Sequence, residues 1–333
     1  MIVVIGASGF IGFHLVKSLM NNGYDVLATG RRLSSIEYYK DNNIPCIDFD
    51  ITNKDDFKKL PTENVEAVVL LAALLPANVT DYKTNKYVDV NILGTINALE
   101  YCKNNGVKKL ISTTSYADVS GAWEKDVALK EDTPRNFSYS GDHASYIISK
   151  NAATDFILHY NAEFGMKGVI FRLPPVYGVG PHSEIYVDGK IYKSGFQIFI
   201  DKALTGQSII IYGDKNVSRD IVYVKDVVLA ILGVIKSDKA LGLYNLSSGV
   251  AITLEQQAKD IVNVFSKENN KSSILYQADK NNNSKSYLFD ISKAKKDFNY
   301  MPQFSNFKEL LVDYKNELNN SDTIIFFKDR KKD

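Results

Sequence analysis

Tyr146 and Lys150 are the residues whose types and spacing most directly suggest chemistry. They form a Tyr-x-x-x-Lys pair, and a separation of four residues places both side chains on one face of a helix. Because a nearby ammonium stabilises a phenolate, we expect Lys150 to lower the pKa of Tyr146 from its usual value of about 10. A tyrosine tuned in this way can act as a general acid or base. A pair this short also occurs by chance, so its meaning depends on the elements that position it.

The first twelve residues, MIVVIGASGFIG, predict one such element. Residues 2–5 form an apolar run typical of a buried parallel strand, and apolar residues then recur at helical spacing. Gly6 permits a sharp exit from the strand, Gly9 admits a pyrophosphate close to the backbone, and Gly12 lets the helix pack near the sheet. The N-terminus of that helix offers free N–H groups and partial positive charge to phosphates. The stretch therefore predicts a bound dinucleotide.

Strand-like and helix-like segments alternate through the first half of the chain. We expect strands at 25–29, 44–49, 67–73, 108–113 and 168–173, and helices at 87–103 and 146–160. Short strands that alternate with helices form a parallel sheet with right-handed crossovers. The predicted fold class is therefore α/β, with a doubly wound parallel sheet.

This alternation ends at Leu173, where prolines and glycines become frequent. We place a domain boundary there. The expected parts are a dinucleotide-binding domain at 1–173, a smaller, irregular substrate-binding region at 174–318 with a hairpin-like piece at 186–192, and a tail at 319–333. Residues from about 219 to 247 are expected to pack back onto the first domain. Substrate specificity usually resides in such loop-rich additions.

Composition narrows the class of protein. The chain has 333 residues, of which 45% are hydrophobic and 24% charged, and a net charge of +1 without a long single-sign block. It therefore does not suggest a nucleic-acid partner. No apolar run approaches the roughly 20 residues of a membrane helix, and the first strand begins at Met1, so we expect a cytoplasmic protein. The spacing of the two cysteines, Cys46 and Cys102, is not that of metal ligands, and the histidines are scattered along the chain. No metal site is therefore expected.

The GxxGxxG spacing of the glycines resembles that of the short-chain dehydrogenase/reductase superfamily. GASGFIG at 6–12 resembles in particular the extended branch, the sugar-nucleotide epimerase/dehydratase family. The likeness extends to about residue 302, through FRLPPVYG at 171–178, GDKNVSRDIVYVKD at 213–226, YNLSSG at 244–249 and DISKA at 290–294. It implies a Rossmann-like fold, a nucleotide-sugar substrate, NAD or NADP as cofactor, and a homodimer built on the helices after Tyr87 and at Tyr146.

The resemblance also implies a catalytic set. Tyr146 and Lys150 match the family's catalytic pair, and the lysine would also hold the nicotinamide ribose. The third member follows the strand at 108–113, where Ser115 aligns and Thr114 is the alternative. Its hydroxyl would orient the reacting oxygen towards the tyrosine. The 4,6-dehydratases of the family carry Asp-Glu after this position, whereas this chain has Tyr116 and an alanine, so dehydration is not expected.

Substrate contacts are implied at Ser115, Tyr116, Pro175 and Arg219. Pro175 stands where the family commonly has an asparagine, and proline cannot donate a hydrogen bond. The family's usual Val-Tyr-Gly is replaced by Asp-Val-Ser at 118–120, so the substrate pocket is atypical. Arg219 matches the arginine that pairs with the diphosphate of a nucleotide-sugar, a partner that suits a guanidinium. The alternative is a structural salt bridge from Arg219 to Asp220 or Asp226.

The type of cofactor is suggested by Arg31 and Arg32. NAD-binding folds place an acidic residue about 20 residues after the glycines to bind the ribose 2′-hydroxyl. Here two arginines take that place, and a guanidinium can pair with a 2′-phosphate, which favours NADP over NAD. The alternative is that both arginines are simply solvated. The implied cofactor contacts are Gly6, Ser8, Gly9, Phe10, Ile11, Gly12, Arg31, Arg32, Asp50, Ile51, Leu71, Ala72, Ala73, Asn91, Thr113, Tyr146, Lys150 and Pro174.

Four functions remain to be compared. The arginines favour a reductase that uses NADPH to reduce a 4-keto sugar. The first alternative is a 4-epimerase with tightly bound NAD, which would use the same catalytic residues. The second is a reductase of small ketones or aldehydes, which needs no diphosphate clamp. A non-catalytic redox-sensing regulator would need neither Tyr146 nor Lys150, so the presence of both argues against it.

Overall fold

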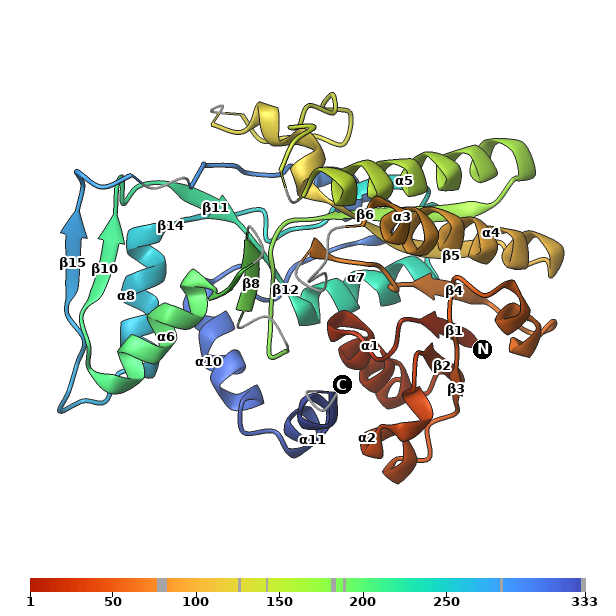
Figure 1. The fold of residues 1–333 in the computed structure, drawn as a ribbon, viewed down its shortest axis with the longest axis horizontal. Helices are drawn as coiled ribbons and strands as arrows, with labels where there is room; N and C mark the ends of the chain where they lie inside the picture. The colour runs from red at the N-terminus through yellow and green to blue at the C-terminus, as the bar shows by residue number, and fades with distance from the viewer. Residues whose placement is uncertain are drawn as a thin grey trace.

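A seven-stranded sheet with only parallel pairings forms the centre of the larger lobe (Figure 1). The computed structural model describes residues 1–76, 83–124, 127–141, 143–180, 184–187, 190–281 and 284–330. The strand order is β13-β6-β5-β4-β1-β2-β3, with β1 (Ile2–Ile5), β2 (Val26–Gly30), β3 (Cys46–Asp48), β4 (Ala67–Leu70), β5 (Lys109–Ser115), β6 (Lys167–Leu173) and β13 (Gly242–Asn245). With β1 inside the order, the chain winds outwards in both directions, which confirms the predicted doubly wound α/β fold.

Helices cover both faces of this sheet, and Figure 1 shows α4 (Gly94–Asn104) with α5 (Ala144–Phe164) on one side and α1 (Phe10–Asn21) with α7 (Val224–Lys236) on the other. The side chains of β1 alternate between two cores. Ile2 and Val4 belong to the core beneath α1 and α7, whereas Val3 and Ile5 belong to the core beneath α4 and α5. Both faces of the strand are therefore buried, which explains its uninterrupted apolar run.

The helix expected at 87–103 has a different form in the structure. It consists of α3 (Thr84–Tyr87), a π-helical segment (Val88–Leu93) and α4. The apolar spacing at 87–103 is close to that of an α-helix, so the pattern alone did not indicate the wider turn. A π-turn of this kind is uncommon and often lies at a functional site. Its buried residue, Asn91, is described below with the site.

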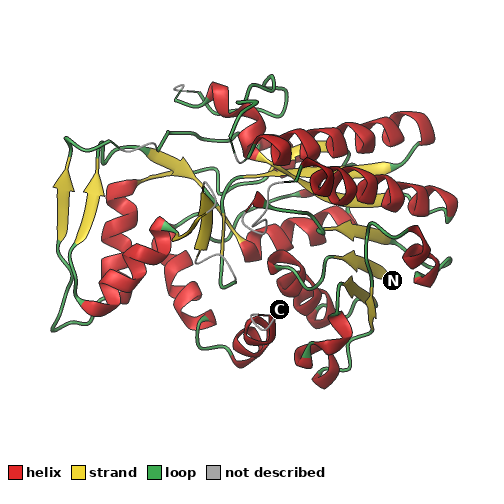
Figure 2. Ribbon diagram, viewed as in Figure 1, coloured by secondary structure: helices red, strands yellow, loops and turns green. Residues whose placement is uncertain are grey.

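The second lobe has its own core and is mostly helical, with a strand pair at its outer edge (Figure 2). It contains α6 (Gly195–Thr205), α8 (Leu254–Phe265), α10 (Phe307–Glu317) and the pairs β7 (Val176–Tyr177) with β12 (Val222–Tyr223), β8 (Glu184–Val187) with β9 (Lys190–Lys193), β10 (Ile209–Tyr212) with β15 (Ile274–Gln277), and β11 (Ser218–Asp220) with β14 (Ala251–Thr253). The β8–β9 pair corresponds to the hairpin expected at 186–192, whose turn residues 188 and 189 lie outside the described residues.

The two lobes are not consecutive in the chain. After the second lobe begins, α7 and β13 return to the large sheet, and α9 (Ser292–Phe298) packs against α7. β6 ends at Leu173, but the division into domains at that residue stays a prediction. The last helix, α11 (Ser321–Arg330), lies beside α2 (Glu37–Asp41) of the larger lobe (Figure 1).

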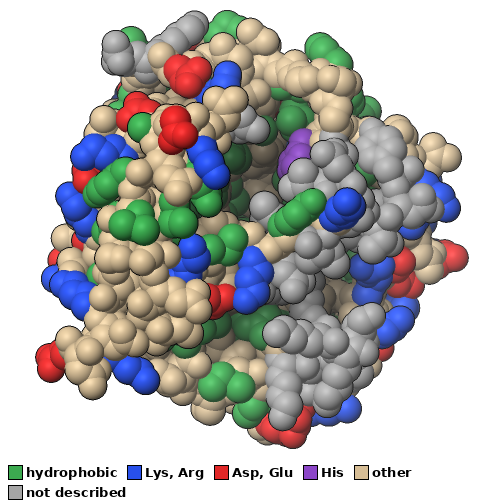
Figure 3. Space-filling view, turned by 60° about the vertical axis from the view of Figure 1, so that its left-hand side comes forward, with side chains coloured by type: hydrophobic (Ala, Val, Ile, Leu, Met, Phe, Trp, Pro, Cys, Tyr) green, Lys and Arg blue, Asp and Glu red, His purple; other side chains and the backbone are tan. Residues whose placement is uncertain are grey.

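The described surface carries charges of both signs. On the face seen in Figure 3, acidic and basic side chains are interspersed, in keeping with the net charge of +1. None of the helices in the described ranges is long and apolar enough to cross a membrane. Within the same ranges, no three histidine, cysteine or acidic residues are grouped in a way that could hold a metal ion.

Candidate active site

The turn between β1 and α1 requires glycine at two positions. Gly6 has a φ of +100°, and a Cβ there would lie 2.5 Å from the backbone nitrogen of Ala72. A Cβ on Gly12 would lie 2.2 Å from the carbonyl oxygen of Gly6. Gly9 is the N-cap of α1, so no side chain caps the first turn. The turn thus has the close-packed backbone and the uncapped helix N-terminus that a pyrophosphate cradle requires, and its binding of a pyrophosphate stays a prediction.

Further cofactor candidates surround this turn. The backbone nitrogens of Leu71 and Ala72 both donate to the carbonyl of Ile5, at 2.8 and 2.9 Å, so the strand end after β4 lies against the glycines. A Cβ on Gly30 would lie 2.9 Å from Ser8 Oγ, so the loop that follows β2 starts beside the turn. Arg31 and Arg32, the next two residues, are exposed. The structure therefore brings the two arginines to the edge of the cradle.

The strand-3 motif lies farther along the same edge. Ile51 is buried and packs against Gly94, where a Cβ would lie 3.0 Å from Ile51 Cγ1. Asp50 Oδ1 accepts hydrogen bonds from the backbone nitrogen and hydroxyl of Thr52, at 2.9 and 2.7 Å. One carboxylate oxygen of Asp50 therefore serves a local turn, whereas its adenine contact stays a prediction.

Tyr146 and Lys150 lie in the first two turns of α5, with Lys150 only 6% exposed. A buried asparagine ties this helix to the loop after β4. Asn91 Oδ1 accepts from the backbone nitrogen of Leu74 at 2.8 Å, and its Nδ2 donates to Ser149 Oγ at 2.9 Å. Ser149 lies between the tyrosine and the lysine and donates to the carbonyl of Tyr146 at 2.8 Å. Asn91 therefore positions the catalytic helix through bonds within the protein.

Burial dominates the protonation of the pair. It lowers the pKa of Lys150 to about 8. It also raises the pKa of Tyr146 well above 10, with further increases from the neighbouring Tyr87 and Tyr116. The expected lowering of the Tyr146 pKa by Lys150 is therefore wrong for this structure, because an enclosed site disfavours the charged forms of both groups. Burial therefore favours the neutral form of Tyr146, which is the form that can donate a proton.

The strand end that should complete the catalytic set carries two hydroxyl groups. Ser115 is the last residue of β5, and its Oγ accepts a hydrogen bond from the backbone nitrogen of Ala117 at 3.2 Å. The Oγ1 of Thr114 is buried and has no hydrogen-bond partner among the described residues. Thr113 is half-buried in the same strand. The choice between Ser115 and Thr114 stays open in this geometry.

Arg219 lies on β11 and forms no ion pair within the described part of the chain. Its Nε is buried and has no hydrogen-bond partner there. Asp220 instead accepts from the hydroxyls of Ser247 and Ser248, both at 2.7 Å. Asp226 accepts from the backbone nitrogens of residues 303 and 304, at 2.7 and 3.1 Å. The alternative of a structural salt bridge from Arg219 is therefore not observed, and the guanidinium remains for a ligand.

The remaining implied contacts lie where the lobes meet. Tyr116 follows Ser115 directly, and Arg219 is near enough to oppose the increase in its pKa that burial causes. Pro174 and Pro175 lie between β6 and β7, and the carbonyl of Pro175 accepts from Val222 at 3.2 Å. Pro175 thus joins strands of the second lobe to the end of the sheet.

Sequence reasoning missed a buried ion pair at this sheet edge. Arg172 on β6 is 2% exposed and donates from Nε and Nη2 to Asp118 Oδ2, at 3.2 and 2.9 Å. Its Nη1 donates to Asn245 on β13 at 3.1 Å. The pair anchors the 3₁₀-helical segment Tyr116–Ala122 that follows Ser115. In the sequence, Asp118 was noted only as a departure from the family's Val-Tyr-Gly. No pattern near Asp118 predicts its partner, Arg172, which lies 54 residues farther along the chain.

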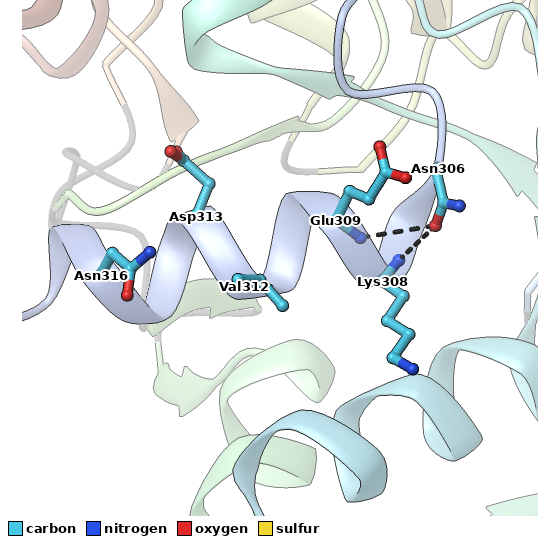
Figure 4. Close-up of a pocket in the computed structure, with 6 residues that line it drawn as sticks. All are labelled: Asn306, Lys308, Glu309, Val312, Asp313 and Asn316. Carbon is cyan, nitrogen blue, oxygen red and sulfur yellow. Dashed lines mark hydrogen bonds between the residues drawn. The ribbon is translucent and has the colours of Figure 1, made fainter.

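A separate pocket of about 460 Å³ lies along α10 (Figure 4). It is lined by Asn306, Lys308, Glu309, Val312, Asp313 and Asn316. Asp313 is engaged with the Tyr223 hydroxyl at 2.7 Å and the Lys225 ammonium at 2.8 Å. None of the predicted catalytic or cofactor residues lines this pocket, so it is not the candidate active site.

Known proteins resemble this chain over most of its length. The family model described as the NAD dependent epimerase/dehydratase family matches residues 2–247. A putative UDP-glucose 4-epimerase of Methanocaldococcus jannaschii is 36% identical over 238 residues, which cover 69% of this chain and 72% of that protein. A UDP-glucuronate 4-epimerase of Thermodesulfobacterium geofontis is 31% identical over 265 residues, covering 74% of this chain and 75% of the relative.

A solved structure is similar over the whole fold. The UDP-glucose 4-epimerase of Thermotoga maritima, crystallised with UDP-glucose, has a TM-score of 0.75 and 25% sequence identity. The superposition covers 96% of this chain and 99% of that one. The similarity thus includes both lobes.

Proposed function

Since this chain belongs to the NAD-dependent epimerase/dehydratase family, we propose that it transfers hydride to and from the sugar of a UDP-sugar and so epimerises the sugar at C4. The resemblance that the glycine spacing and the Tyr-x-x-x-Lys pair indicated is confirmed by this membership. The chain is an enzyme of the short-chain dehydrogenase/reductase superfamily, and its family is NAD-dependent. The C4 position and the UDP group come from the names of the relatives and are part of the proposal.

One observation carries the proposal: Tyr146 and Lys150 are enclosed on α5, and Asn91 joins this helix to the loop that borders the glycine cradle. A cofactor with its pyrophosphate at Gly6–Gly12 would need its nicotinamide beside these residues. The close-packed glycines fit such a cofactor, because a side chain at Gly6 or Gly12 would collide with backbone. When bound, the dinucleotide supplies the hydride acceptor and donor.

The side chains then have distinct roles. In its phenolate form Tyr146 takes the proton of the sugar hydroxyl as hydride leaves the carbon, and the resulting phenol returns that proton when hydride adds to the opposite face. Lys150, whose pKa is about 8, is mostly protonated at neutral pH, and its ammonium stabilises this phenolate form of Tyr146. The hydroxyl of Ser115, or of Thr114 as the alternative, donates to the reacting oxygen and orients it. The terminal Nη groups of Arg219, which lacks an ion-pair partner within the described ranges, bind the diphosphate.

A second candidate is a reductase of a 4-keto sugar, and the loop after β2 favours it. Arg31 and Arg32 are exposed and directly follow Gly30, which lies beside Ser8, so they are placed to meet a phosphate on the adenosine ribose. Asp48 accepts from the backbone nitrogen and the hydroxyl of Ser34, at 2.8 and 2.5 Å, so its carboxylate is engaged within this loop. We propose that the site accepts NADP, with NAD as the alternative. NADP would support net reduction more readily than a cycle that returns its own hydride.

An assay of product and cofactor separates the two candidates. The protein is incubated with UDP-glucose and NAD, and separately with UDP-4-ketoglucose and NADPH. Epimerisation yields UDP-galactose without a lasting change in the absorbance band of the reduced nicotinamide, whereas reduction consumes NADPH in proportion to product. Tyr146→Phe should lower either activity by roughly 10²- to 10⁴-fold. If the variant keeps full activity, the assignment of Tyr146 is wrong.

The implied homodimer also remains a proposal. Val88 and Leu93 near the start of α4, and Ile148 and Phe156 on α5, are large apolar side chains with more than a third of their surface exposed. An apolar face on two adjacent helices suits a four-helix interface between two copies. Light scattering of the purified protein would give the mass of a dimer if this is correct, and that of a monomer if it is not.

A further inference from the structure

Three aromatic side chains form a contiguous cluster next to the catalytic strand end. The rings of Tyr116 and Trp123 are stacked, with centroids 5.1 Å apart and an interplanar angle of 15°. Tyr287 contacts both, at 5.2 Å from Tyr116 and 4.8 Å from Trp123. Tyr116 is near enough to Tyr146 to raise its pKa. This aromatic cluster, Tyr116, Trp123 and Tyr287, therefore forms part of the surroundings of the catalytic tyrosine.

Arg219 lies directly beside the cluster. The backbone nitrogen of Asp220 donates to the carbonyl of Tyr287, and the backbone nitrogen of Tyr287 donates to the carbonyl of Ser218, both at 3.1 Å. These two bonds flank Arg219 and hold its strand against that of Tyr287. The charge of Arg219 opposes the increase in the pKa of both Tyr116 and Tyr287 that burial causes, so the guanidinium is close to both phenols.

This cluster contains buried donors that lack acceptors. Trp123 Nε1, the Tyr287 hydroxyl and Arg219 Nε are all buried and have no hydrogen-bond partner among the described residues. Tyr287 is 5% exposed, and its hydroxyl lies close to that of Tyr116 without forming a hydrogen bond with it. A buried donor that has lost its hydrogen bonds to water and gained none in the protein destabilises the folded state. Three such groups in one cluster indicate a site whose acceptors come from a ligand.

We propose that Trp123, Tyr287 and Arg219 Nε bind a carboxylate on the sugar, so that the preferred substrate is a nucleoside diphosphate hexuronate. This inference rests on the proposed function, because it places the sugar between Tyr146 and Arg219. Glucose and glucuronate, the sugars of the relatives, differ at C6, where one has a hydroxymethyl group and the other a carboxylate. The cluster supplies a reason to choose between them.

The chemistry of the donors favours a carboxylate over the other common substituents. An indole N–H and a guanidinium N–H can only donate, and a carboxylate is an acceptor-only group with room for several donors. A hydroxymethyl or acetamido group would bring a donor of its own that these two residues cannot accept. Hydrogen bonds to a charged acceptor are also stronger than those to a neutral acceptor, so a carboxylate would gain most from the N–H of Arg219 Nε.

Binding measurements on the full-length protein with NADP or NAD present can test this. Dissociation constants are measured by calorimetry for UDP, UDP-glucose and UDP-glucuronate. The variants are Trp123→Phe, which keeps a stacking ring but removes the N–H, and Tyr287→Phe, which removes only the hydroxyl. Tyr276→Phe is the matched control, because its hydroxyl donates to Glu255 at 2.7 Å on an exposed part of the second lobe.

We expect UDP-glucuronate to bind roughly tenfold or more tightly than UDP-glucose in the native protein. Trp123→Phe and Tyr287→Phe should each remove most of that preference, and both should retain the native affinity for UDP, which carries no sugar. Tyr276→Phe should retain the full preference. Melting temperatures near that of the native protein would show that the variants are folded.

Two results would overturn the inference in different ways. If UDP binds but UDP-glucuronate is no better than UDP-glucose, or if both cluster variants keep the preference, the carboxylate subsite is wrong and the proposed function stands. If UDP and both sugars fail to bind to the native protein, the proposed function itself fails, and this inference fails with it.

Discussion

At the scale of single residues, burial has more effect on the candidate site than charge pairing does. Lys150 has no carboxylate partner within the described ranges, and its lowered pKa is caused by desolvation alone. Burial likewise raises the pKa of Tyr146. Arg172 shows the opposite solution, since the buried guanidinium is matched by Asp118 and by the Asn245 amide oxygen. The ammonium of Lys150 is thus buried without a charged partner, whereas the structural guanidinium of Arg172 is buried with one.

The lowered pKa of Lys150 predicts a dependence of stability on pH. In the folded protein this lysine loses its proton near pH 8, whereas in the unfolded chain it does so near 10.5. Below pH 8 both states are protonated, and the folded state bears the cost of a buried charge. As pH rises from about 8 to about 10.5 the folded state releases its proton first, so stability rises with pH.

Lys150→Met should therefore stabilise the protein at about pH 7, and this advantage should shrink as pH approaches about 10, by roughly 3 kcal/mol at most. Urea denaturation of both proteins at several pH values would measure the difference. An equal difference at all pH values would show that the lysine is not desolvated in the folded state.

Arg31 and Arg32 predict a preference between cofactors. NADPH should bind roughly tenfold more tightly than NADH, because a guanidinium can pair with the 2′-phosphate. Arg31→Ala combined with Arg32→Ala should lower the affinity for NADPH by a similar factor and leave that for NADH unchanged. Fluorescence titration would measure both. Arg135→Ala is a control, since Arg135 pairs with Asp155 at 2.7 Å. Equal affinities in the native protein would refute the preference for NADP.

At the scale of elements, the strand–turn–helix unit and the π-helical segment do most of the positioning. The turn brings Gly6 against the Leu71–Ala72 backbone, and the π-turn brings Asn91 to Leu74 and Ser149. The glycine turn and the π-helical segment both contact the loop after β4. That loop therefore links the dinucleotide cradle to the catalytic helix, and disturbing it from either side should affect the site.

Gly12→Ala tests the close packing of the turn. The added Cβ would lie 2.2 Å from the carbonyl oxygen of Gly6 and 2.8 Å from Ala7 Cα, so backbone must move. We expect a loss of about 1–3 kcal/mol in the free energy of unfolding and weaker dinucleotide binding. Gly195→Ala is the matched control, because a Cβ at that first residue of α6 meets no atom within 4 Å. Similar results for the two variants would contradict the predicted role of Gly12.

At the scale of the whole molecule, the last helix joins the two lobes. It follows α10 of the second lobe and packs on the dinucleotide-binding half, where Phe326 is fully buried and stacks on Phe13 at 4.2 Å. Tyr39, which contacts Phe326, donates from its hydroxyl to the carbonyl of Ala7 in the glycine turn at 2.9 Å. The C-terminal tail, for which the sequence predicts no function, thus packs against residues that hold the glycine turn in place.

Phe326→Ala should destabilise the protein by about 3–5 kcal/mol, as expected when a buried aromatic ring is removed from a core. Ile325→Ala, at the adjacent and 38% exposed position, should have a much smaller effect. Thermal or chemical denaturation would compare the two variants. If Phe326→Ala is as mild as Ile325→Ala, then α11 does not contribute to the core of the dinucleotide-binding half.

Features that depend on residues near one another in the chain were accessible from the sequence. The apolar run of β1, the glycine turn and the helix after it follow from local spacing, as does the alternation of strands and helices in the first half. The Tyr-x-x-x-Lys pair is likewise local, because a helix places residues four apart on one face. These patterns were sufficient for the fold class and the family.

Features that depend on distant residues were decided by the tertiary structure alone. The pKa of Lys150 reflects how completely other elements enclose it, and the salt bridge of Arg172 joins residues 54 positions apart. Tyr116 and Tyr287 meet from opposite halves of the chain, and α11, close to the C-terminus, contacts α1 and α2, which lie close to the N-terminus. The burial of a side chain and the identity of its hydrogen-bond or ion-pair partner are set when elements distant in the chain pack together. The spacing of residues within one segment therefore cannot predict them.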